Sequence, residues 1–198
     1  MSGRVDPVLD YSTPPRYSGK TMMTLFSSTE NDPELLEIRT NRWTRNKFQS
    51  PLIHCEIYFP SERASFGILN GGTAQWTYNR TLMRHWVTLE HDLSDQQHAN
   101  AWALFDTYVG REFDTFGFYL GLLCGTGVFI SPSSTFCSRI VAEVYTHPAV
   151  SLLRPCDFEE YEQMSPPNIY EHLQRAARHH QPLIVRLEEA QRNEAALY

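Results

Sequence analysis

The sequence predicts an α+β fold in which a small antiparallel sheet packs against helices. Residues 52–59 alternate between apolar and polar side chains, which is the period of a strand with one buried face. The turn sequence Asn70-Gly71-Gly72 lies among several short apolar runs, a pattern typical of antiparallel hairpins. A helix is indicated over Asp92–Val109, where Ser94 and Gln97 have the spacing of a capping box.

Length and composition indicate one globular domain. The chain has 198 residues, of which 41% are hydrophobic and 20% charged. We expect a domain over 20–187, a flexible arm over 1–19 and a polar tail over 188–198. The net charge of −6 offers no basic field for a nucleic acid, and no apolar run reaches the roughly 18 residues of a membrane span. The N-terminus lacks the apolar core of a signal peptide, so a cytoplasmic or virion-associated location is expected.

The individual elements follow from periodicity and from turn residues. Short strands are expected at residues 21–26, 52–59, 64–69, 75–78, 84–89 and 182–187. Asp32 before Pro33 indicates a first helical turn, and longer helices are expected over 92–109, 137–147 and 169–179. In the helix over 92–109 we assign one apolar stripe to the core, formed by Ala99, Trp102, Phe105 and Val109.

Four cysteines occur in the chain, Cys55, Cys124, Cys137 and Cys156. Their spacing fits neither paired CxxC motifs nor a zinc ribbon, and the adjacent His179 and His180 lack the spacing of metal ligands. We therefore predict no metal and no cofactor. Without a signal peptide, the thiols are expected to be reduced.

Cys137 is the strongest candidate for chemistry. Small hydroxyl residues at 133–135 lead into it, and an apolar helical pattern follows. In the first turn of a helix, free N–H groups and the positive end of the helix dipole favour a thiolate, the nucleophilic form of cysteine. The alternative is an inert buried cysteine.

A candidate base lies on the strand over 52–59. His54 and Glu56 share one face of this strand, while the other face is apolar. A strand with one buried face does not need a titratable pair on the other face. The alternative is a hydrogen-bonded core histidine beside a glutamate that faces water.

Four motifs occur in a fixed order between residues 21 and 177. They are the lead-in Trp43-Thr44-Arg45 to the strand Leu52-Ile53-His54-Cys55-Glu56-Ile57, the segment Phe113-Asp114-Thr115-Phe116-Gly117, the helix start Phe136-Cys137-Ser138, and the helix entry Ser165-Pro166-Pro167-Asn168. Together they resemble the circularly permuted branch of the NlpC-type papain-like superfamily. That branch includes relatives of lecithin:retinol acyltransferase and occurs in bacteria, phages and large DNA viruses.

The resemblance implies a permuted papain-like fold, in which a sheet carrying His54 packs against a helix carrying Cys137. It implies that Cys137 is the nucleophile and His54 its base. Glu56 matches the polar residue that orients the histidine. A residue of a neighbouring strand is the more usual solution in the superfamily, which leaves Ser65, Asn70 and Thr73 as alternatives. Relatives often carry a glutamate two positions after the cysteine, where this chain has Arg139.

The activity implied by the resemblance is that of a cysteine hydrolase or acyltransferase with a thioester intermediate. Its substrate would be an amide or ester bond in a peptide, in peptidoglycan or in a lipid. The competing hypothesis is a binding or structural module without catalysis, associated with a virus or phage particle and contacting an assembly partner through the terminal tails. An ordinary cysteine pKa at Cys137, about 8.5, would favour that second hypothesis.

Overall fold

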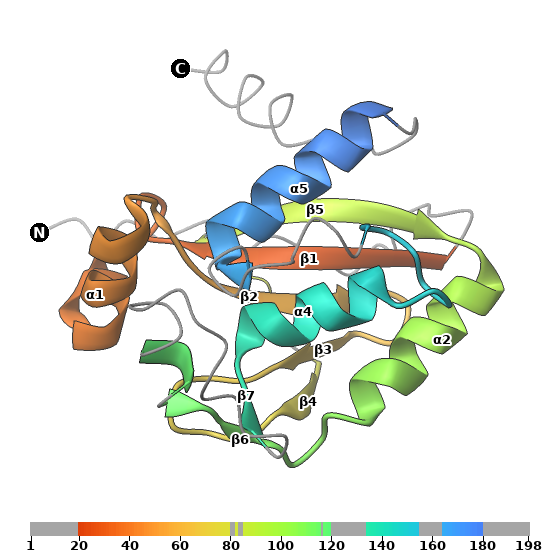
Figure 1. The fold of residues 1–198 in the computed structure, drawn as a ribbon, viewed down its shortest axis with the longest axis horizontal. Helices are drawn as coiled ribbons and strands as arrows, with labels where there is room; N and C mark the ends of the chain where they lie inside the picture. Colours follow the sequence, from red (N-terminus) through yellow and green to blue (C-terminus); the bar gives the residue numbers. More distant parts are fainter. Residues whose placement is uncertain are drawn as a thin grey trace, which may run out of the picture.

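A five-stranded antiparallel sheet forms the centre of the protein (Figure 1). Its strands are β1 (Lys20–Ser28), β2 (Leu52–Phe59), β3 (Ala64–Gly67), β4 (Gln75–Tyr78) and β5 (Trp86–Leu93). They lie in the order β4-β3-β2-β1-β5, so that β1 pairs with β2 on one side and with β5 on the other. Helices pack against this sheet, which confirms the predicted α+β class.

The computed structural model describes residues 20–79, 82, 85–115, 117–119, 134–154 and 164–179. The predicted arm (1–19), final strand (182–187) and tail (188–198) lie outside the described residues, as do Cys124 and Cys156. Within the described part of the chain, no helix combines the length and apolar character needed to cross a membrane.

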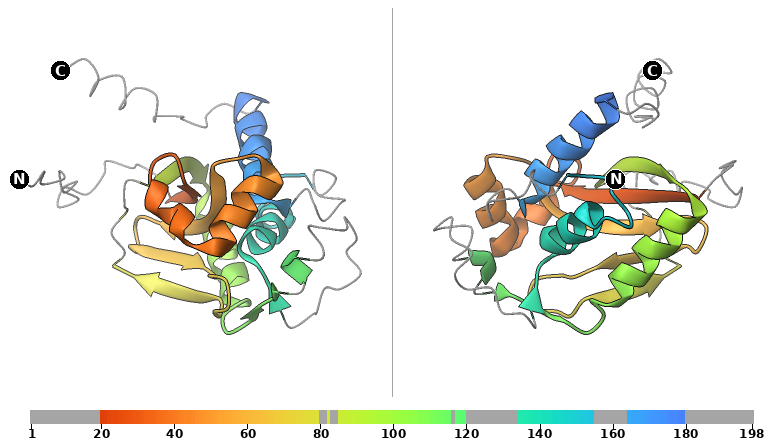
Figure 2. Two further views of the ribbon diagram at one scale, coloured as in Figure 1. Left: turned by 90° about the vertical axis from the view of Figure 1, so that its left-hand side faces the viewer. Right: turned by 45° about the vertical axis from the view of Figure 1, so that its right-hand side comes forward.

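Helices cover one face of the sheet (Figures 1 and 2). The helical elements are the 3₁₀ turn η1 (Pro33–Glu37), α1 (Arg39–Phe48), α2 (Asp95–Asp106), α4 (Cys137–Thr146) and α5 (Pro166–His179). Side chains of α2, α4 and α5 join apolar residues of β1 and β2 in one buried cluster. A short parallel pair, β6 (Glu112–Phe113) with β7 (Ser134–Thr135), precedes α4. Burial of this apolar face is the main force that docks α4 on the sheet.

The helix after β5 is shorter than predicted. Strand β5 continues through Asp92, and the helix begins at Asp95 because Ser94 forms the predicted capping box with Gln97. The assigned core stripe is partly wrong. Ala99 is exposed and Val109, beyond the helix end, is 49% exposed. The buried face of α2 instead consists of His98, Ala101 and Phe105.

A buried hydrogen-bond network links α4 to strands β1 and β5. The Thr24 hydroxyl of β1 lies 2.7 Å from His91 Nε2 of β5 and 2.6 Å from the Tyr145 hydroxyl of α4. The His91 ring also packs edge-on against the Tyr145 ring. These polar groups are buried away from water. Their hydrogen bonds to one another offset the free-energy cost of losing hydration. This hydrogen-bond network helps to fix the position of α4 on the sheet.

His91 makes the stability of the fold sensitive to acid. Burial lowers the pKa of His91 from 6.5 to about 3, so the folded protein holds the ring neutral. An unfolded chain binds a proton there below about pH 6.5, and the free energy of unfolding should therefore fall by up to about 1.4 kcal/mol per pH unit as pH drops from 6.5 towards 3. Urea unfolding at several pH values measures this slope. His91→Gln should flatten it, and an equal slope in both proteins would contradict the assignment.

Candidate active site

Cys137 is the first residue of α4, as predicted. Phe136 precedes the helix in an extended conformation, with φ −139° and ψ 165°. The first helical hydrogen bond runs from the Ile140 N–H to the Phe136 carbonyl at 3.1 Å. The N–H groups of Cys137 and Ser138 therefore precede the helical ladder and lie at the positive end of the helix dipole. Cys137 is only 6% exposed.

Cys137 lies beside an edge of β2 that β3 leaves uncovered. The β3 ladder pairs with β2 over Ile57–Phe59 alone, so it ends before His54 and Cys55. Helix α4 packs against β2, and its first turn reaches this uncovered part of the strand. A side chain at this edge can touch residues that point to opposite faces of the strand. The Cys137 thiol does so, since both His54 and Cys55 lower its pKa.

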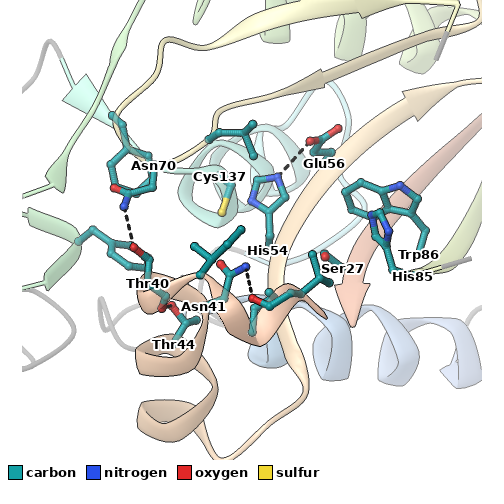
Figure 3. Close-up of a pocket in the computed structure, with 16 residues that line it drawn as sticks. Ser27, Thr40, Asn41, Thr44, His54, Glu56, Asn70, His85, Trp86 and Cys137 are labelled. Carbon is teal, nitrogen blue, oxygen red and sulfur yellow. Dashed lines mark hydrogen bonds and ion pairs between the residues drawn. The ribbon is translucent and has the colours of Figure 1, made fainter. Parts of the chain in front are cut away.

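His54 and Glu56 form a close pair on the face of β2 that the sequence predicted. His54 Nε2 lies 3.1 Å from Glu56 Oε1. The Glu56 side chain is 3% exposed and that of His54 14%, so the predicted alternative of a water-facing glutamate is wrong. With Nε2 bound to the carboxylate, Nδ1 is the ring nitrogen left to face Cys137 (Figure 3).

The contact between Cys137 and His54 shifts both pKa values towards an ion pair. Burial lowers the pKa of His54, but the charge and hydrogen bond of Cys137, followed by those of Glu56, outweigh it and raise the pKa to about 10. A hydrogen bond from Cys55 lowers the pKa of Cys137 well below its usual value, and burial opposes this shift. The charge and hydrogen bond of His54 lower it further. A thiolate beside an imidazolium is therefore the favoured state at neutral pH.

Cys55 belongs to this site, and the sequence reasoning did not include it there. Hydrogen bonding by its side chain is the largest cause of the lowered pKa of Cys137, and its backbone contributes as well. Burial and the charge on Cys137 raise the pKa of Cys55, so Cys55 stays a thiol and keeps the proton that it donates. Its only sequence signal is that it follows His54 directly, and alternation placed it on the opposite face of the strand.

A cavity of about 380 Å³ opens in front of these residues (Figure 3). Its apolar lining consists of Leu35, Ile38, Ile53, Leu69, Trp86, Phe113 and Phe118. His54, Glu56 and Cys137 line the cavity. The other polar residues of the lining are Ser27, Thr40, Asn41, Thr44, Asn70 and His85. The Asn70 amide donates to the Thr40 hydroxyl at 3.1 Å and joins the β3–β4 turn to α1. The cavity thus has space for a small, largely apolar group beside the sulfur.

The Phe113–Gly117 motif builds one wall of this cavity. The Asp114 carboxylate accepts a hydrogen bond from the Gly117 N–H at 2.7 Å, and the Asp114 N–H donates to the Thr135 carbonyl at 2.7 Å. A Cβ atom on residue 117 would overlap the Asp114 carboxylate, so glycine is required there. This tight turn presents Phe118 to the cavity.

The alternatives for the residue that orients His54 lie elsewhere. Asn70 binds Thr40, and Thr73 is exposed in an isolated bridge with Glu112. Ser65 is buried on β3 opposite Tyr58. Glu56 contacts the His54 ring directly, at 3.1 Å. Its role in catalysis stays a prediction.

Arg139, the departure from the family pattern, has partners outside the cavity lining. Its Nε donates to the Glu143 carboxylate at 2.7 Å, one helical turn further along α4. The other oxygen of Glu143 accepts a hydrogen bond from the Tyr108 hydroxyl at 2.5 Å. The cavity-lining residues do not include Arg139. Glu143 thus links Arg139 to Tyr108, in the segment that follows α2.

The described residues hold no group of three or more histidine, cysteine, aspartate or glutamate side chains suited to a metal ion. Comparison with known protein families, with curated proteins and with solved structures finds no match for this chain. What the site can do is therefore inferred from its own geometry.

Replacing Cys55 should weaken the thiolate at Cys137. Cys55→Ala removes a hydrogen bond to a charged group, worth about 1.5–3 kcal/mol, so alkylation of Cys137 by iodoacetamide should slow about tenfold or more on the acidic side of its pH profile. Mass spectrometry of the peptide containing Cys137 measures the rate separately from other cysteines. Cys55→Ser retains a donor and should slow the reaction less. An unchanged profile in Cys55→Ala would show that the hydrogen bond is unimportant.

Proposed function

We propose that this protein is a cysteine hydrolase or acyltransferase that forms a thioester on Cys137. The observation that supports this proposal most directly is the arrangement of three side chains. Cys137 at the start of α4 interacts with His54, and the Nε2 atom of His54 contacts the buried carboxylate of Glu56. This arrangement of nucleophile, base and orienting group is the general requirement for nucleophilic catalysis. We propose further that the fold is a permuted papain-like one, since His54 precedes Cys137 in the chain and lies on the sheet.

In the first half of the reaction, the Cys137 thiolate attacks the carbonyl carbon of an amide or ester. The developing oxyanion would be stabilised by first-turn N–H groups of α4, such as that of Cys137 itself. His54 then gives its proton to the leaving amine or alcohol, the bond to that group breaks, and the acyl group remains on sulfur as a thioester.

In the second half, neutral His54 takes a proton from water or from an acceptor hydroxyl or amine. That nucleophile attacks the thioester carbon, the carbon–sulfur bond breaks, and the thiolate beside the imidazolium is restored. Glu56 keeps the ring in one orientation throughout and favours its charged form. Water yields a hydrolase and an acceptor molecule yields an acyltransferase. Peptides, peptidoglycan and lipids all contain bonds of the required type.

Covalent labelling tests the nucleophile. The parent protein should react with iodoacetamide at Cys137 at pH 6–7, where an ordinary thiol with a pKa of about 8.5 is largely protonated. Cys137→Ala should lose that modification while the peptides of the other cysteines label as in the parent. If Cys137 labels as slowly in the folded protein as in the denatured protein, the enzyme hypothesis is refuted and the binding or structural module is favoured.

The pH dependence of turnover tests the base. With p-nitroacetanilide as the acyl donor, an amide whose leaving amine must be protonated, activity should fall on the alkaline side near pH 10, where His54 loses the proton that it must donate. His54→Ala should lower the rate roughly 10²- to 10⁴-fold. Circular dichroism would verify that the variant is folded. An activity that keeps rising beyond pH 10, or one that survives His54→Ala, would exclude His54 as the general acid and base.

A further inference from the structure

Glu56 needs space inside the sheet, and a single residue on β3 provides it. The register pairs Ile57 with Phe66 and Tyr58 with Ser65, so the next position on β3 opposite Glu56 is Gly67. Residues opposite each other in an antiparallel pair point to the same face. Gly67 therefore lies on the face that carries the His54–Glu56 pair.

The space above Gly67 is filled by the Glu56 side chain. A Cβ atom on residue 67 would lie 2.6 Å from Glu56 Cγ, 2.9 Å from Cδ and 3.3 Å from Oε1. The first two distances are far below the van der Waals separation of carbon atoms, which is about 3.5–4.0 Å. Any residue except glycine at this position would require Glu56 to move.

Backbone conformation gives no separate reason for glycine at this position. The glycines with positive φ among the described residues are Gly71 and Gly110, and Gly67 is not one of them. The β3–β4 register runs without a bulge from Ala64 opposite Tyr78 to Gly67 opposite Gln75. A glycine inside a regular strand is unfavourable by itself and indicates the close approach of another group. Here that group is Glu56.

The clash would be relieved mainly by the carboxylate. The backbone of Gly67 is held in the sheet, since Gly67 pairs with Gln75 of β4 and the preceding Phe66 pairs with Ile57 of β2. Glu56 is instead held at its end, by the 3.1 Å contact with His54 Nε2. Displacement of its Cγ would carry Oε1 away from the imidazole.

We propose that Gly67 is a positioning residue for the reaction, whose missing side chain leaves the space in which Glu56 lies against His54. This inference rests on the function proposed above. It predicts that Gly67 acts on Cys137 only through Glu56 and His54, with no contact to the substrate.

A double-mutant cycle tests this route. The parent, Gly67→Ala, Glu56→Ala and the double variant are alkylated with iodoacetamide over a range of pH, and the Cys137 peptide is quantified by mass spectrometry. Gly67→Ala should shift the profile to higher pH and slow alkylation about tenfold on its acidic side, since one pKa unit changes the thiolate fraction tenfold. In the Glu56→Ala background the same change should have no effect, because nothing remains to be displaced.

Control variants separate positioning from damage to the sheet. Gly72→Ala is the matched glycine substitution, because its Cβ would meet only the Leu69 carbonyl at 3.3 Å, and it should leave the profile unchanged. If Gly67→Ala alone fails to fold, thermal unfolding of the double variant decides. A double variant as stable as Glu56→Ala supports the clash with Glu56, and one that also fails to fold overturns it.

The outcomes also separate the inference from the proposed function. A parent protein whose Cys137 titrates as an ordinary thiol contradicts both. A depressed Cys137 pKa that Gly67→Ala leaves unchanged contradicts the inference alone. An equal shift with and without Glu56 likewise overturns it, since Gly67 would then act by another route.

Discussion

The contact between the first turn of α4 and the uncovered edge of β2 is the interaction on which the site depends. Because β3 joins β2 only from Ile57 onward, the Cys137 sulfur can lie beside the strand and contact residues of both its faces. His54 offers a charged partner from one face, and Cys55 offers two hydrogen-bond donors at the same edge. Were the β3 ladder two residues longer, β3 would occupy the place of the sulfur.

The buried charges of the site require compensation from the surrounding structure. A thiolate, an imidazolium and a carboxylate together carry one net negative charge in a site that is almost fully buried. Buried charge is costly unless nearby dipoles and donors compensate it. The N-terminus of α4 and the donors of Cys55 supply that compensation, and both depend on the seating of α4. The buried hydrogen bond between Thr24 and Tyr145 helps to fix the position of α4 at the C-terminal end of the helix.

The sequence was informative wherever the signal was local. Alternation over 52–59 was enough to predict that His54 and Glu56 share a face, and the hydroxyl-rich run before Cys137 was enough to predict a helix start. The roles of Cys55 and Gly67 depended on where a ladder ends and on cross-strand register, and the contact of Glu143 depended on a tyrosine 35 positions away. Those relations are tertiary, so periodicity could not reveal them. Val109 was misassigned because the helix ends at Asp106, before its apolar pattern does.

The protonation state of His54 tests the central claim most directly. Nitrogen chemical shifts of the His54 ring, recorded by NMR at pH 8, distinguish a neutral ring from one with both nitrogens protonated. An ion pair with Cys137 requires a protonated ring in the parent, since the His54 pKa is raised to about 10. It also requires that the ring be less protonated in Cys137→Ala than in the parent, since the largest of the causes that raise its pKa is then gone and burial still lowers it. A neutral ring in the parent at pH 8 would contradict the thiolate–imidazolium pair.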